Sequence, residues 1–227
     1  MLLSLIACGI PAVDMPPKKV YILPLGDSIT QGGRADREEY TYRLPLYQML
    51  TKDKVDFAFV GSLKTGLQAE AKWPQPFDPN HEGHYGWKTE EVRAKLQGWV
   101  KGYANAPDIA LIHLGSNDQN GDPVKDVAEP LAKIIETLRK SNPKIVILLG
   151  HLNFNGGAAL KIRPVVEELA IRKSTAESPV RTVPHYLGWI ENPASPGCDT
   201  YDWAHPNPQG QRKMADAWYK AMKPFLK

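Results

Sequence analysis

This sequence has few cysteines, no long apolar run and no large excess of one charge. Two cysteines among 227 residues, Cys8 and Cys198, cannot build a disulfide framework. No apolar run approaches the roughly 20 residues that a transmembrane helix needs. The formal net charge is only +3, and without a block of Lys and Arg the chain does not present a nucleic-acid surface. The apolar share of 42% is typical of one folded globular domain.

The N-terminus is short and apolar, and it ends at a cysteine. LIAC, which closes with Cys8, resembles the lipid-attachment box of bacterial lipoproteins, although no basic residues precede it and the apolar stretch is short. We therefore expect an exported protein, secreted, periplasmic or anchored through Cys8, with a cytoplasmic protein as the alternative. Residues 1–18 are expected to be a partial signal or a linker, and residues 19–227 the folded domain.

Short runs rich in β-branched residues alternate with segments of helical periodicity. The runs show little polar alternation, as expected for strands of a sheet that is covered on both faces. They are residues 20–25, 55–60, 109–114, 145–149 and 180–186. Apolar residues recur at helical spacing within 92–100, 127–135, 162–169 and 214–222. This order predicts an α/β fold, a three-layer α/β/α sandwich with a central, mostly parallel five-stranded sheet.

Polar residues directly follow several of the predicted strands. In LPLGDSIT, Ser28 comes after the first run, where it is either a nucleophile or the cap of a helix. Ser116, Asn117 and Asp118 follow the third run, and His151 follows the fourth. Open parallel sheets bind ligands beyond the carboxyl ends of their strands. We therefore expect these side chains to meet at one edge of the sheet.

An acid and a histidine stand three residues apart near the C-terminus, in DTYDWAHPNPQG. Pro206 biases His205 away from a helical conformation, so that Asp202 and His205 can face the same way in a tight turn. A histidine oriented by a carboxylate is what a serine needs to become a nucleophile. The alternative is an aspartate that makes a turn beside an ordinary surface histidine.

Four segments together resemble the conserved blocks of the SGNH (GDSL-type) hydrolase superfamily. In chain order they are Gly26-Asp27-Ser28, Gly86, Gly115-Ser116-Asn117-Asp118 and Asp202-x-x-His205. The resemblance implies a serine esterase that works through an acyl-enzyme and needs no cofactor or metal. The G-x-S-x-G elbow of the α/β-hydrolases is absent, because position 30 is Thr.

The same resemblance assigns roles to individual residues. Ser28 is implied to be the nucleophile, His205 the general base and Asp202 the partner that orients it. The implied oxyanion hole consists of the backbone N–H groups of Ser28 and Gly86 and the side-chain amide of Asn117. A glycine backbone can approach a substrate oxygen closely, and an amide can stabilise a developing oxyanion without transferring a proton.

The stretch HEGHYGW, residues 81–87, narrows the resemblance. It is similar to HEGHSGW in the acetyl-xylan esterases of carbohydrate esterase family 3, with Tyr85 in place of serine. The likeness implies O-acetyl groups on a carbohydrate such as xylan as substrate, and it selects Gly86 over Gly83 as oxyanion donor. The alternatives are a lysophospholipase, thioesterase or arylesterase of the same superfamily, or a carbohydrate-binding module without catalysis.

Four residues near these blocks are candidates for contacts with a small acyl ester or an acetylated carbohydrate: Asp27, Tyr85, Trp87 and Trp203. Asp27 could instead hold the turn that carries the nucleophile. The tryptophans could instead anchor their loops. Trp203, between Asp202 and His205, is the strongest candidate for a substrate contact.

The remaining histidines are expected to play structural roles. His81 and His84 lack the H-E-x-x-H spacing of a zinc site, and we expect them to brace the loop that carries Gly86. His113 lies inside a predicted strand and should be a hydrogen-bonded core residue. His151 could line the cleft or lie beneath it.

Overall fold

Residues 19–226, apart from residues 69 and 75–76, are described by the computed structural model. The predictions made for residues 1–18, including Cys8, fall outside the described residues. The boundary between that segment and the folded domain stays a prediction.

Six strands form one sheet in which every pairing is parallel. They are β1 (Val20–Gly26), β2 (Phe57–Phe59), β3 (Glu82–Gly83), β4 (Ile109–His113), β5 (Val146–Gly150) and β6 (Val180–Val183). The order along the sheet is β2-β1-β4-β5-β6, and β3 pairs with the carboxyl end of β1 beyond the shorter β2. The α/β class is confirmed, but the predicted number of five strands was wrong. The strand β3 was missed because it is two residues long and has no apolar run of its own.

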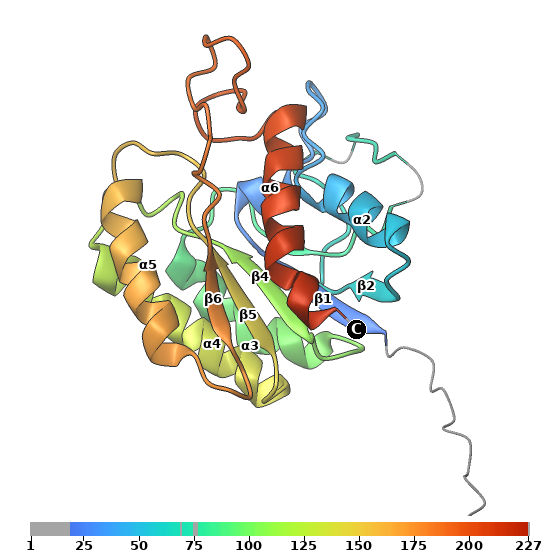
Figure 1. Cartoon of the computed structure of the whole chain (residues 1–227), viewed down its shortest axis with the longest axis vertical. Coiled ribbons are helices and arrows are strands. Elements are labelled where there is room, and N and C mark those ends of the chain that lie inside the picture. The colour runs from blue at the N-terminus through green and yellow to red at the C-terminus, as the bar shows by residue number, and fades with distance from the viewer. Residues whose placement is uncertain (1–18, 69, 75–76, 227) are drawn as a thin grey trace, which may run out of the picture.

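Helices cover both faces of this sheet (Figure 1). They are α1 (Ser28–Gln31), α2 (Arg43–Lys52), α3 (Thr89–Gly102), α4 (Glu129–Ser141), α5 (Ala159–Lys173) and α6 (Pro208–Met222), with a π-helical turn η1 (Pro123–Ala128) before α4 and a 3-10 turn η2 (Lys223–Phe225) at the end. α3, α4 and α5 lie on one face, and α2 and α6 lie on the other. Periodicity predicted α3 to α6 but not α2, whose buried positions include Arg43 and Pro45.

Alternate side chains of β1, β4 and β5 enter two separate cores. In β1, Leu23 and Leu25 pack toward α3 to α5, whereas Val20 and Ile22 pack toward α2 and α6. Burying one such side chain contributes roughly 1.5–3 kcal/mol. A shift of one residue in the pairing of a strand would move its side chains to the opposite faces of the sheet. The apolar pattern therefore fixes the register, and with it the point at which each strand ends.

The strand order reverses at β1, which lies between β2 and β4. Ligands of open parallel sheets bind outside the carboxyl ends of the strands at such a reversal. Ser28 follows β1 and Asn117 follows β4, so both residues flank this position. Within the described residues, no helix combines the length and apolar character needed to cross a membrane.

Substitutions at two glycines can test how tightly β3 packs against α1. A Cβ at Gly83 would lie 2.5 Å from the backbone nitrogen of Gln31, whereas a Cβ at Gly98 on α3 would meet nothing within 4 Å. We expect Gly83→Ala to lower the free energy of unfolding in urea by about 1–3 kcal/mol through overpacking. Gly98→Ala should raise it by about 0.5–1 kcal/mol, because alanine is the better helix former. Equal effects of the two substitutions would contradict the tight packing of β3.

Candidate active site

Ser28 is the first residue of α1 and comes one residue after β1. Asp27 is the N-cap of α1, and its Oδ1 accepts the N–H of Ile29 at 2.9 Å. The first N–H groups of a helix have no acceptor within the helix, so the N–H of Ser28 stays available at this end. Ser28 therefore opens a helical turn, and its place at the carboxyl end of a buried strand is also the place expected of a nucleophile. The two interpretations of LPLGDSIT are compatible.

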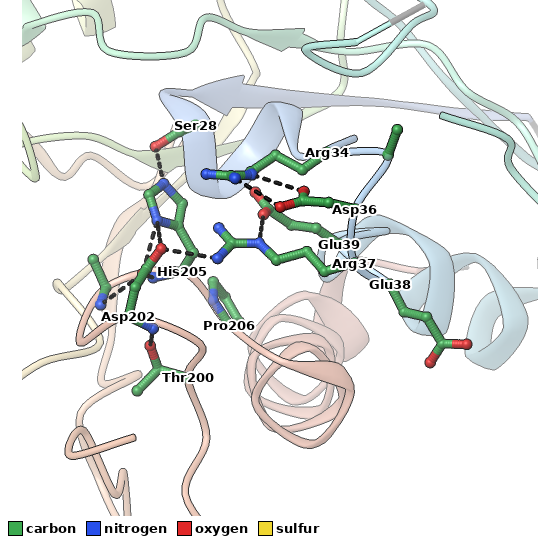
Figure 2. A network of polar contacts seen from close by, with 12 residues as sticks. Ser28, Arg34, Asp36, Arg37, Glu38, Glu39, Thr200, Asp202, His205 and Pro206 are labelled. Carbon is green, nitrogen blue, oxygen red and sulfur yellow. Dashed lines mark hydrogen bonds and ion pairs between the residues drawn. The ribbon is translucent and has the colours of Figure 1, made fainter. Parts of the chain in front are cut away.

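A chain of short contacts joins Ser28, His205 and Asp202 (Figure 2). The Nε2 of His205 lies 2.9 Å from the Oγ of Ser28, and its Nδ1 lies 2.9 Å and 3.0 Å from the two carboxylate oxygens of Asp202. A carboxylate only accepts hydrogen bonds, so Nδ1 carries the ring proton and Nε2 is left to accept the hydroxyl proton. The three residues are thus arranged for the removal of a proton from Ser28.

The turn that carries Asp202 and His205 is closed at its base and constrained at its tip. Thr200 and Pro206 form an isolated antiparallel bridge, and the N–H of Tyr201 donates to the carbonyl of His205 at 2.9 Å. The N–H of His205 donates to Asp202 Oδ1 at 2.9 Å. These bonds make a tight turn out of a segment without regular secondary structure, as the sequence predicted.

Arg37 is a residue of this site that sequence reasoning missed. Its Nη1 donates to Asp202 Oδ2 at 3.0 Å, and its Nε donates to the buried Glu39 (Figure 2). Arg37 and Asp202 are 165 positions apart, and GGRADREEY matches no motif, so no local signal could have found the pair.

The environment of Asp202 favours its ionised form. Burial acts to raise the pKa of Asp202, but the N–H and imidazole of His205 and the guanidinium of Arg37 outweigh burial and lower that pKa. A carboxylate that stays ionised can hold the His205 ring in one tautomer and stabilise the imidazolium.

The loop after β3 distinguishes Gly86 from Gly83. The N–H of Gly83 donates to Nδ1 of His81 at 3.0 Å, so it is already engaged. Gly86 has φ +81°, and a Cβ added there would meet nothing within 4 Å, so its backbone borders open space. Of the two glycines, Gly86 has the backbone that a substrate oxygen can approach.

Asn117 is anchored to the same loop by one half of its amide. Its Nδ2 donates to the carbonyl of Trp87 at 2.9 Å, which leaves the second N–H of the amide for another acceptor. The adjacent Asp118 accepts both the N–H and the hydroxyl of Thr89 at the start of α3, at 3.1 Å and 2.7 Å. These bonds hold the loops after β3 and β4 together.

The four residues predicted to contact substrate lie in different environments. Asp27 is fully buried, which corrects the prediction that it touches substrate and leaves it the role of holding the turn. Burial raises the pKa of Asp27 to about 6. Tyr85 stacks on the ring of His205, with centroids 5.3 Å apart and planes at 12°. Trp87 stacks on His84 at 4.4 Å, as a loop anchor does, whereas Trp203 is 56% exposed.

His81 and His84 both brace the loop that carries Gly86. Besides accepting from Gly83, His81 contacts the carbonyl of Thr65 through Nε2 at 3.0 Å. His84 contacts Glu82 at 2.8 Å, and its ring stacks on those of Trp87 and Trp99. Among the described residues, no group of three or more His, Cys, Asp or Glu side chains is arranged to hold a metal ion.

The histidines at the ends of β4 and β5 lie below the surface. His151 is 2% exposed and contacts Glu167 of α5 at 2.6 Å, so it does not line the cleft. His113 is a core residue, as predicted, but neither ring nitrogen has a hydrogen-bond partner among the described residues. Burial lowers the pKa of His113 to about 4, so the ring is neutral at pH 7.

Solved structures with the same fold include carbohydrate esterases. A carbohydrate esterase family 3 protein from Talaromyces cellulolyticus aligns with a TM-score of 0.76 at 24% identity, over 91% of this chain and 97% of that one. A family 3 carbohydrate esterase from Clostridium thermocellum aligns with a TM-score of 0.74 at 26% identity, over 92% and 98% of the two chains.

Sequence comparison places the chain within a family. It is 26% identical to a multidomain esterase from Ruminococcus flavefaciens over 96% of its own length, and it spans 30% of that longer protein. The profile of the GDSL-like lipase/acylhydrolase family matches residues 25–213, which include every block described above. The chain therefore belongs to the GDSL-like lipase/acylhydrolase family of carboxylic ester hydrolases, as the sequence predicted.

Proposed function

We propose that this protein is a serine esterase that removes O-acetyl groups from a carbohydrate such as xylan. The observation that carries the proposal is the continuous chain of contacts from Ser28 Oγ through His205 to Asp202, at 2.9 Å and 2.9–3.0 Å. Similarity to a multidomain esterase supports the esterase part of the proposal, and similarity to a family 3 carbohydrate esterase supports the carbohydrate part.

The proposed reaction has two halves. In the first, His205 Nε2 takes the hydroxyl proton as Ser28 Oγ attacks the acetyl carbonyl, and the tetrahedral intermediate then expels the sugar hydroxyl, which receives that proton from His205. In the second, water loses a proton to His205 and attacks the acetyl-serine; the tetrahedral intermediate then expels Ser28 Oγ, which receives that proton from His205, and the acetyl group leaves as acetic acid, which ionises to acetate. Asp202 holds the ring and stabilises its charge in both halves.

The negative oxygen of each tetrahedral intermediate needs donors at a fixed position. In the proposal these are the N–H groups of Ser28 and Gly86 and the free half of the Asn117 amide. The donors sit on backbone turns and on an anchored side chain, so they need little rearrangement when charge develops.

Removal of the nucleophile tests the proposal directly. We expect Ser28→Ala to lower kcat for acetate release from acetylated xylan by at least about 10³-fold, because no other group replaces the attacking oxygen. Circular dichroism and the melting temperature should match those of the unmodified protein, since the hydroxyl contacts only His205 among the described residues.

Three outcomes would contradict parts of this proposal. Turnover by Ser28→Ala at the unmodified rate would exclude Ser28 as nucleophile. A preference for octanoyl over acetyl and butyryl esters would favour the lysophospholipase or thioesterase alternative. Binding of acetylated xylan without hydrolysis of any ester would favour the carbohydrate-binding module.

The oxyanion role of Asn117 gives a second prediction. Asn117→Ala should lower kcat by about 10²–10³-fold with little change in KM, since the amide acts on charge that forms only in the transition state. Asn120→Ala, an exposed position on the same loop, is the control and should keep full activity. A rise in KM alone would identify Asn117 as a ground-state contact instead.

Arg37 is proposed to position Asp202, and pH profiles can test this role. Arg37→Gln removes one of the groups that lower the pKa of Asp202. The pKa of Asp202 should therefore rise, so the acid limb of kcat/KM should move to higher pH and kcat should fall about tenfold, while Arg37→Lys should restore part of kcat. An unchanged acid limb in Arg37→Gln would show that the ion pair has no influence on the site.

A further inference from the structure

A cavity of about 330 Å³ lies beside the proposed catalytic residues. It is lined by Gln119, Phe154, Gly156, Gly157, Glu191 and the segment Asp202-Trp203-Ala204. This segment belongs to the turn that ends in His205, and Asp202, which contacts that histidine, lines the cavity itself. Its volume falls at the lower end of the roughly 300–1,000 Å³ found for small-molecule sites.

One wall of the cavity is an indole that the backbone holds away from the core. Trp203 has φ +75°, a conformation that side chains other than glycine rarely adopt. Its neighbours are fixed, because His205 donates its N–H to Asp202 and the carbonyl of Ala204 accepts from Nδ2 of the buried Asn153 at 2.9 Å. Trp203 is the only aromatic among the exposed large apolar side chains of the described residues. Backbone strain of this kind is often retained where a side chain serves a ligand.

Two other lining residues of the cavity carry acceptor oxygens. Glu191 accepts the N–H of Asn155 at 2.5 Å through Oε2, and no hydrogen bond among the described residues engages its Oε1. The amide nitrogen of Gln119 donates to the carbonyl of Ser116 at 2.9 Å, and this bond leaves the amide oxygen as an acceptor. Two oxygens on anchored side chains are therefore available to donors from a ligand.

Two successive glycines keep the cavity open. A Cβ built at Gly156 would reach 3.6 Å from Glu191 Oε1, so any longer side chain there would occupy the space in front of that oxygen. Gly157 has φ +57°, which favours glycine on backbone grounds as well.

We propose that this cavity is a saccharide subsite that holds one pyranose ring of the acetylated substrate. A pyranose has a C–H face that packs against an aromatic ring and a rim of hydroxyl groups that donate to carboxylate and amide oxygens. A long acyl chain would pack against Trp203 and Phe154 but would leave the oxygens of Glu191 and Gln119 without donors, which is costly. The inference rests on the proposed function and adds the residues that select the sugar.

Two substitutions probe the subsite without removing a proposed catalytic group. Trp203→Gly deletes the indole and keeps the turn, because glycine adopts φ +75° without strain. Gly156→Leu fills the cavity, and its matched control is Gly98→Leu on the exposed side of α3, where a Cβ would meet nothing within 4 Å. Melting temperatures establish that each variant is folded.

The readout is the ratio of kcat/KM for methyl 2-O-acetyl-xylopyranoside, whose free hydroxyls can donate to Glu191 and Gln119, to kcat/KM for ethyl acetate, whose alcohol is too small to reach the cavity. We expect this ratio to fall at least tenfold in Trp203→Gly and in Gly156→Leu and to stay unchanged in Gly98→Leu. An unchanged ratio in both cavity variants would overturn the subsite, and so would a preference for octanoyl esters that the same variants abolish.

Binding of xylotriose, titrated by calorimetry against the Ser28→Ala protein, separates this inference from the proposed function. Binding that is lost when Gly156→Leu is added supports the subsite even if the unmodified protein hydrolyses neither ester, a result that would refute the proposed function alone. Absence of xylotriose binding to the Ser28→Ala protein would overturn the subsite.

Discussion

All pairings of the sheet are parallel, and this constraint places the loops that follow β1, β4, β5 and β6 at a single edge. Residues from distant parts of the chain can meet there. Ser28 and His205 are 177 positions apart, yet Oγ and Nε2 lie 2.9 Å from each other. The alternating cores on the two faces of the sheet fix where each strand ends, so the same packing that stabilises the fold also sets the geometry of the site.

Buried polar bonds keep these loops in place where apolar packing ends. Gln211 of α6 donates to the carbonyls of Glu38 and Pro206, so one buried amide ties the segment of Arg37 to the turn of His205. Arg43 donates to the carbonyls of Thr30 and Gln31 at the end of α1. A site whose groups are held in this way needs little reorganisation during a reaction, which is the main source of electrostatic catalysis.

The proposed chemistry and the proposed substrate selection share one loop, between β6 and α6, and otherwise come from different loops. The groups assigned to bond breaking follow β1, β3 and β4, with His205 added from the segment between β6 and α6, which forms the loop at the top of Figure 1. The walls assigned to the sugar come mainly from the loops after β5 and β6, around Gly156 and Glu191. Only the segment between β6 and α6 belongs to both sets, so substitutions around Gly156 can change the substrate while the reaction stays the same.

The sequence by itself determined the α/β class, five of the six strands and the spacing of Asp202 and His205, because these depend on periodicity and on residues close together in the chain. Tertiary structure alone decided that Asp27 is buried, that the N–H of Gly83 is engaged while Gly86 borders open space, and that Arg37 holds Asp202. It also decided that Trp203 faces a cavity with Glu191. Each of these features joins backbone or side chains from separate loops, and local spacing carries no information about which loops the parallel sheet brings together.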